Sequence, residues 1–292
     1  MRSHFLISGI LALFIMASCS PSNQLTNLKT NAENLEKAGN YEQAYQSWLD
    51  YLDKTPVEEV DGSDFARAAN VAFNAGQTEQ AVLWFDQARY KNYADAEMYI
   101  DLAKIYHNQD NLSKELSALE YYRENFGTAN SEVNARLFAV YSEINELNKA
   151  NTIWQYLSAA EQSKKENLVR FLEINKKLEN DAVCDSVATA VLQMDPDQFE
   201  ALDWMAKKYY WAGQNRYDRE MKKYEQNKTR KQYNILLEEL DKVTADFKKA
   251  LPYLERLWEQ KPGKEYAGYF ANIYARFGDE QKVEYYKKYI NN

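Results

Sequence analysis

The stretch AGNYEQAYQSWLDYLDKTP, residues 38–56, decides which kind of fold this chain adopts. After Gly39 it carries an aromatic residue, a small residue at Ala44 and a bulky one at Trp48, and it closes with Pro56. A glycine before such a run and a proline after it are typical of a helix with a defined start and end. The stretch is therefore either a single helix or one copy of a unit that recurs along the chain.

The turn residue of this stretch recurs at a nearly constant interval. Its counterparts follow one another after 37, 34, 35, 34 and 34 residues, at Gly39, Gly76, Asp110, Asn145, Glu179 and Gly213. Five residues after each turn stand mostly small side chains, at Ala44, Ala81, Glu115, Ala150 and Cys184. Four residues further on stand mostly bulky ones, at Trp48, Phe85, Leu119, Trp154 and Ala188. Seven residues before the turn come Ala32, Ala69, Ala103, Phe138, Leu172 and Ala206.

Helix packing explains why small and bulky residues recur at the same spacing from each turn. Two helices joined by a tight turn approach closely, so a small residue is needed where they cross and a bulky one fills the groove beside it. A period near 34 residues with this content resembles the tetratricopeptide repeat (TPR) over most of the chain. The resemblance implies an all-α, right-handed superhelix of helix-turn-helix units. The alternative is an irregular helical bundle with accidental periodicity.

The register breaks after Gly213, because the next convincing turn, Gly278, comes 65 residues later. Apolar residues continue at steps of three and four on both sides of the gap, from Leu202 to Tyr224 and from Tyr233 to Leu257. This pattern predicts that both helices of the sixth unit extend into one long antiparallel hairpin, with the insertion at about 214–246 and the tip near 227–231. Pro252 is expected to bend the returning helix. An extra degenerate repeat is the alternative, but no Gly or Pro between residues 243 and 250 marks its turn.

The composition agrees with an all-helical chain. The 292 residues include only 9 Gly and 5 Pro, while 23 Tyr suit helix packing in which a ring is buried and its hydroxyl reaches water. The formal net charge of -8 argues against binding to nucleic acid, because a phosphate backbone would be repelled.

The N-terminus, MRSHFLISGILALFIMASCS, has the parts of a secretory signal: Arg2, an apolar run, and small residues before Cys19. Ala17-Ser18-Cys19 resembles the lipobox of bacterial lipoproteins. This implies a signal peptide over residues 1–18, acylation of Cys19 (palmitate among the lipids), a lipidated linker over 19–24 and a TPR-like solenoid over 25–292. In such lipoproteins Ser20 after the cysteine implies an outer-membrane location, and the absence of a following acidic cluster favours the periplasmic side. A cleaved signal with an incidental Cys19 is the alternative.

No catalytic constellation is evident, and we predict a protein that is not an enzyme and binds no cofactor or metal. The chain has two histidines, His4 and His107, and the first leaves with the predicted signal. It has no HExxH, CxxC pair or glycine-rich phosphate loop. Cys184 stands where the repeat needs a small buried side chain, so packing explains it.

In TPR arrays the first helix of each pair lines a concave groove, and the register predicts which residues face it. The candidates for binding an extended peptide are Asn70, Phe73, Asn74, Lys104, His107, Asn108, Lys177, Lys207, Tyr210 and Trp211, with Glu143, Glu173 and Asp203 on the same side. Ala66 and Ala135 stand where carboxylate-clamp members of the family have lysine, which speaks against that mode of binding. Wet surface is the alternative explanation of the polar residues.

The hairpin tip is basic in an otherwise acidic chain. Residues 215–232 hold seven basic and three acidic side chains, a local charge of 7 - 3 = +4. The basic ones are candidate contacts for an acidic partner or anionic head groups: Arg216, Arg219, Lys222, Lys223, Lys228, Arg230 and Lys231. A solvated helix surface with internal ion pairs is the alternative.

Two classes of function remain open from the sequence. One is a non-catalytic, membrane-anchored scaffold or adaptor in the cell envelope, whose partners are proteins and whose acylated Cys19 lies in the lipid bilayer. The other is an envelope enzyme or glycan-handling accessory with a ligand site in the concave groove.

Overall fold

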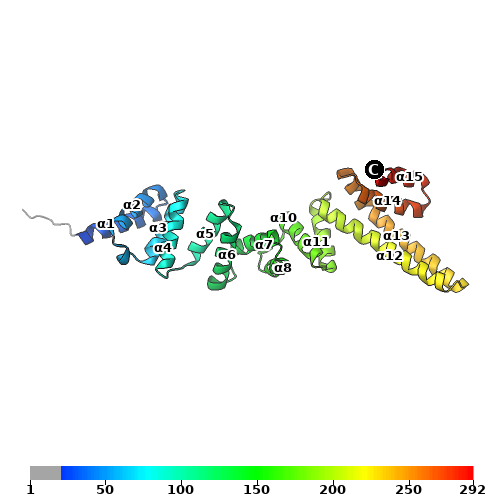
Figure 1. Cartoon of the computed structure of the whole chain (residues 1–292), viewed down its shortest axis with the longest axis horizontal. Coiled ribbons are helices and arrows are strands. Elements are labelled where there is room, and N and C mark those ends of the chain that lie inside the picture. The colour runs from blue at the N-terminus through cyan, green and yellow to red at the C-terminus, as the bar shows by residue number, and fades with distance from the viewer. Residues whose placement is uncertain (1–20, 292) are drawn as a thin grey trace, which may run out of the picture. The chain divides into compact units, whose positions relative to one another are not determined.

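The computed structural model of the chain describes residues 21–291 (Figure 1). The predicted signal peptide, residues 1–18, and the predicted lipidation site Cys19 lie outside these residues. Within residues 21–291 the secondary structure is helical throughout, without strands. The chain divides after Gly127 into two compact units, each of which is described by itself.

The first unit contains three helical hairpins. Its helices are α1 (Pro21–Lys37), α2 (Tyr41–Lys54), the 3-10 turn η1 (Val57–Glu59), α3 (Gly62–Asn74), α4 (Thr78–Tyr90), α5 (Ala96–Asn108) and α6 (Leu112–Phe126). Helix α1 packs on α2, α3 on α4 and α5 on α6, and the pairs stack through α2–α3 and α3–α5 contacts. Helix α1 begins at Pro21, so Pro21 to Gln24, which fall within the linker expected over residues 19–24, are helical.

The second unit contains four more hairpins. Its helices are α7 (Ser131–Glu143), α8 (Leu147–Trp154), α9 (Ala159–Gln162), α10 (Lys165–Lys177), α11 (Asp181–Met194), α12 (Phe199–Gln226), α13 (Arg230–Gln260), α14 (Lys264–Phe277) and α15 (Glu280–Asn291). The short helix α9 was not predicted. It occupies the connection between the fourth and fifth pairs, where Ser158 caps its N-terminus.

The predicted turns are confirmed at five positions. Gly39, Gly76, Asp110, Asn145 and Glu179 all have positive φ, between 52° and 77°, and each lies between the two helices of a pair. The residues five positions after each turn are fully or almost fully buried. They include Glu115, which stands where most other units have alanine. In most units a small residue at the helix crossing and a bulky one beside it therefore hold the hairpin together, as the repeat pattern requires.

The sixth unit is the long hairpin that the apolar spacing predicts. Helices α12 and α13 run side by side and turn at residues 227–229, as Figure 1 shows. Gly213, which stands at the periodic turn position, lies inside α12 and forms no turn. The alternative with an additional repeat is wrong, because α13 continues unbroken from Arg230 to Gln260 and includes Pro252.

Gly213 serves close helix packing. A Cβ at this position would lie 2.9 Å and 3.0 Å from two ring carbons of Phe247 and 3.3 Å from the carbonyl oxygen of Val243. The Phe247 ring is fully buried in the core that joins α12, α13 and α14, so it has little room to move. The missing side chain at Gly213 therefore allows α13 to approach α12.

Two glycine-to-alanine substitutions should have opposite effects on stability. Gly268→Ala lies within α14 with open space around its Cβ, so it should stabilise the chain by about 0.5–1 kcal/mol through helix propensity. Gly213→Ala should destabilise it by about 1–3 kcal/mol, because overpacking against Phe247 outweighs the same propensity gain. Urea unfolding of both variants measures the difference. Stabilisation by Gly213→Ala would contradict the close approach.

Candidate binding surfaces on the helical repeats

In the first unit, the surface formed by the first helices of neighbouring hairpins carries a network of ion pairs. Arg67 of α3 donates to Glu33 (2.6 Å) and Glu36 (2.9 Å) of α1, and Lys29 of α1 lies 2.6 Å from Asp64 of α3. The Asp64 carboxylate also accepts a bond from the Tyr51 hydroxyl at 3.1 Å, and burial followed by this carboxylate raises the pKa of Tyr51 to about 12. These charges hold neighbouring hairpins in register.

Three predicted groove residues of α3 lie at this surface. The Asn70 amide donates to Glu97 at 2.9 Å and to Asp101 at 2.7 Å, both on α5. The exposed Asn74 donates back to the Asn70 carbonyl at 2.9 Å, and Phe73 is half-buried. Asn70 therefore links two repeats, which leaves Asn74 and part of the Phe73 ring for contact with a ligand.

The predicted residues of α5 are exposed. Lys104, His107 and Asn108 lie on the C-terminal half of the helix. The His107 Nδ1 lies 3.5 Å from a carboxylate oxygen of the buried Glu115. His107 therefore covers a polar group that replaces alanine at the helix crossing, and this position explains the histidine without any ligand.

Asp101 makes the stability of this unit dependent on pH. Burial, opposed by the bond from Asn70, raises the pKa of its carboxyl to about 6. The pKa of Asp101 is higher in the folded than in the unfolded chain, so its ionisation destabilises the fold. This loss of stability is absent below pH 4 and complete above pH 6. Asp101→Asn keeps an acceptor for Asn70 and removes the charge.

We expect Asp101→Asn to be about 1–2 kcal/mol more stable than the original chain at neutral pH and to match it near pH 4. Thermal unfolding across this pH range measures the difference. The exposed Asp53→Asn of α2 removes the same charge and serves as the control, with no such trend. A gain that is equal at both pH values would contradict a raised pKa at Asp101.

In the second unit, the corresponding surface of the first helices centres on Asp203 of α12. Its carboxylate lies 2.8 Å from Lys207 and 3.7 Å from Lys176 of α10, and it accepts a bond from the Tyr266 hydroxyl of α14 at 3.1 Å. Lys207 also lies 2.8 Å from Glu265 of α14. Burial lowers the pKa of Lys207, but the Asp203 and Glu265 carboxylates raise it more strongly. The Lys207 side chain is therefore charged.

Lys177 and Glu173 of α10 complete the predicted polar set. Lys177 donates to the side chain of the turn residue Asn145 at 3.0 Å, and Glu173 lies 2.9 Å from Lys176. Glu143 lies exposed at the end of α7, 3.9 Å from Arg136. Lys177, like Asn70 in the first unit, therefore connects two repeats, whereas Glu173 and Glu143 pair within their own helices.

An aromatic surface adjoins this network. Trp211 of α12 is 46% exposed, and its ring packs edge-on against Tyr269 of α14, with centroids 6.4 Å apart. Tyr210 is buried beneath them, 4.4 Å from the Tyr269 ring, and its hydroxyl accepts a bond from Asn272 at 2.5 Å. We call Trp211, Tyr269 and Asn272 the α12–α14 aromatic surface.

Sequence reasoning found Tyr210 and Trp211 but missed Tyr269 and Asn272. Both were accessible from the repeat register, since they stand nine and six residues before the turn at Gly278. The position six before the turn is Asn70, Lys104 and Lys207 in other units, all predicted groove residues. The prediction stopped at the sixth unit because the long hairpin interrupts the register.

The basic residues of the hairpin tip fall into two groups. Arg216 joins the two helices, 3.0 Å from Glu239 and 3.4 Å from Asp246 of α13. Arg219 and Lys223 lie 2.8 Å and 2.9 Å from the buried Glu220. The remaining four are exposed and form no ion pair within residues 21–291: Lys222, Lys228, Arg230 and Lys231. These four are the ones available to a partner.

Three further observations concern metal binding, membrane spanning and thiol chemistry. Residues 21–291 contain no group of three or more His, Cys, Asp or Glu side chains placed to hold a metal ion. None of the helices in that range is long and apolar enough to cross a membrane. Cys184 is buried, and burial raises the pKa of its thiol to about 11, which keeps it protonated.

The repeat geometry defines a TPR-like fold, and comparison with solved structures agrees. A putative protein-binding protein from Bacteroides ovatus superimposes with a TM-score of 0.50 at 19% identity, covering 76% of this chain and all of that one. YrrB, described as a TPR protein with an unusual peptide-binding site, matches at 0.48 and 13% identity, covering 64% and 98% of the two chains. A tetratricopeptide repeat protein from Parabacteroides merdae matches at 0.45 and 10% identity, covering 91% and 92%. No protein-family model and no curated sequence matches the chain.

Proposed function

We propose that this chain is a protein-binding scaffold of the cell envelope, anchored to a membrane by lipid on Cys19. The observation that carries the proposal is the exposed Trp211 beside Tyr269, on a surface where most charged groups already pair with one another. Tryptophan and tyrosine dominate binding energy where they anchor a partner, whereas paired surface charges contribute little. The TPR-like fold and the two peptide- or protein-binding relatives in fold support this role.

Anchoring and location rest on the N-terminal sequence. The lipobox resemblance at Cys19 supports acylation, and Ser20 supports delivery to the outer membrane, on its periplasmic side. A scaffold of this kind would hold its partner close to the membrane without catalysing a reaction.

The test is quantitative co-purification of partners with the tagged full chain from its own cells. Trp211→Ala should reduce the recovered partner at least about tenfold, the effect of losing one anchor worth about 2 kcal/mol. Tyr90→Ala is the control, because Tyr90 of α4 is 81% exposed and lies outside the proposed surface. A third variant replaces residues 215–232 with a neutral linker and separates the hairpin tip from the aromatic surface.

The outcomes are distinct. Loss of partner with Trp211→Ala alone supports the α12–α14 aromatic surface. Loss only with the linker variant would move the contact to Lys222, Lys228, Arg230 and Lys231. If the original chain recovers no protein but retains a glycan in a binding screen, the scaffold proposal is wrong and the glycan-handling alternative replaces it.

A further inference from the structure

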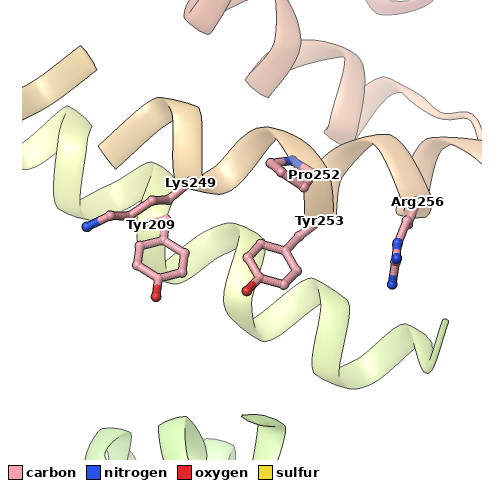
Figure 2. A pocket seen from close by; sticks show the side chains of 5 residues that line it. All are labelled: Tyr209, Lys249, Pro252, Tyr253 and Arg256. Atoms are coloured by element: carbon pink, nitrogen blue, oxygen red, sulfur yellow. The ribbon is translucent and has the colours of Figure 1, made fainter. Parts of the chain in front are cut away.

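A pocket of about 390 Å³ lies between α12 and α13, apart from the surfaces already described. It is lined by Tyr209 of α12 and by Lys249, Pro252, Tyr253 and Arg256 of α13. Figure 2 shows the two tyrosine hydroxyls pointing the same way, with Lys249 beside one ring and Arg256 beyond the other. The rings are nearly parallel, with an interplanar angle of 13° and centroids 6.1 Å apart.

The pocket and the α12–α14 aromatic surface use different sides of α12. Tyr209 and Tyr210 are consecutive, so their side chains leave the helix about 100° apart. Tyr210 packs against Trp211 and Tyr269, whereas Tyr209 packs against Tyr253. A ligand in the pocket would therefore leave Trp211 accessible.

The polar side chains that line the pocket are all hydrogen-bond donors at neutral pH. The exposed Lys249 lies 5.7 Å from the centre of the Tyr209 ring, and Arg256 donates to the Pro196 carbonyl at 2.7 Å. Burial raises the pKa of Tyr253, so its hydroxyl keeps its proton. A lining of two cations and two phenols favours an anionic ligand.

Nearby carboxylates do not cancel this charge. Asp185 is paired at 2.7 Å with Lys208, a third cation 5.4 Å from the Tyr209 ring. Asp197 lies 3.9 Å from Arg256 but is 73% exposed, so water screens that pair strongly. Lys249 and Arg256 can therefore both bind an anionic group.

The spacing of these cations fits a peptide chain. Lys249, Tyr253 and Arg256 share one side of α13, and seven residues separate the two cations by about 10 Å along the helix. A chain in the polyproline II conformation rises about 3.1 Å per residue with three residues per turn, so side chains three residues apart lie on the same side at a similar distance. Pro252, which also lines the pocket, has no N–H to donate to the Lys248 carbonyl within the helix.

We propose that the Tyr209–Tyr253 pocket binds an acidic segment of the partner protein in the polyproline II conformation, with two carboxylates three residues apart that contact Lys249 and Arg256. This inference rests on the proposed scaffold function and adds a second, independent contact to it. The two tyrosine rings would hold the apolar part of the segment between its carboxylates.

The test is selection of a random phage-displayed peptide library on the full chain immobilised in detergent. Peptides with paired Asp or Glu residues should be enriched, and a synthetic peptide of that sequence should bind more weakly at high salt by fluorescence anisotropy. Lys249→Glu combined with Arg256→Glu should weaken its affinity at least about tenfold. Lys261→Glu with Lys288→Glu reverses two exposed charges elsewhere in the unit and should preserve it. Circular dichroism confirms that every variant is folded.

Each result supports or overturns the pocket. Acidic peptides that require Lys249 and Arg256 but not Trp211 support it. Acidic peptides that bind the double variant equally well overturn it, as do acidic glycans that bind in place of peptides. If the selected peptides depend only on Trp211, the pocket proposal is wrong and the scaffold function stands. If no peptide binds to any form of the chain, both proposals are wrong.

Discussion

Replacing Phe247 with alanine is expected to reduce the free energy of unfolding by about 3–5 kcal/mol. The side chain is fully buried in the core that joins α12, α13 and α14, where its ring leaves no room for a Cβ at Gly213 and its centroid lies 5.6 Å from that of the Tyr210 ring. Alanine would leave a cavity at the point where these helices cross. The gap would not close easily, because Arg216 ties α12 to α13 through Glu239 and Asp246.

Urea unfolding followed by circular dichroism measures this loss. The chain has two compact units, so the transition of the second unit is the one that should shift. Leu237→Ala is the matched control, because Leu237 is on the same helix but 46% exposed, and its loss should cost well under about 1 kcal/mol. Equal losses at the two positions would show that the hairpin is not held by the Phe247 core.

Replacing Cys19 with alanine is expected to abolish lipid labelling and to move the chain from the membrane fraction to the soluble fraction. Each buried methylene of an acyl chain contributes about 0.8 kcal/mol of membrane affinity, so several long chains on one residue dominate partitioning. Residues 21–291 contain no helix long and apolar enough to span a bilayer. Labelling with an alkyne analogue of palmitate and cell fractionation measure both effects.

Cys184→Ala is the control for this experiment, since the buried Cys184 is the other cysteine of the chain. It should keep both the label and the membrane location. Persistence of the label in the Cys19 variant would contradict the lipoprotein proposal, while the helical fold and the two proposed binding surfaces would be unaffected.

Much of the fold could be predicted because its determinants are local and periodic. The turn positions at Asp110, Asn145 and Glu179 were identified by spacing although their residue types are poor signals, and all three have positive φ. The long hairpin followed from apolar steps that continued past Gly213. Residue type alone could not settle that position, since glycine serves both tight turns and close helix contacts.

The binding surfaces could be predicted only in part. The repeat register placed Lys207 and Trp211 on one side of α12. It could not show that Lys207 forms ion pairs with Asp203 and Glu265 while Trp211 stays exposed. Such pairing depends on which helices become neighbours. The Tyr209–Tyr253 pocket was missed for the same reason, because its residues are 44 positions apart and meet only when α13 returns along α12.

The left-handed turns carry a consequence for how the chain moves. Gly39, Gly76 and Gly278 adopt this backbone freely, but Asp110, Asn145 and Glu179 hold it with a side chain attached, at about 1 kcal/mol each and least comfortably at Glu179. Burial of the flanking helices closes these hairpins, although the turn residues themselves disfavour the left-handed conformation. Amide hydrogens around the Glu179 turn should therefore exchange with solvent sooner than those around Gly278, making it an early point of local opening.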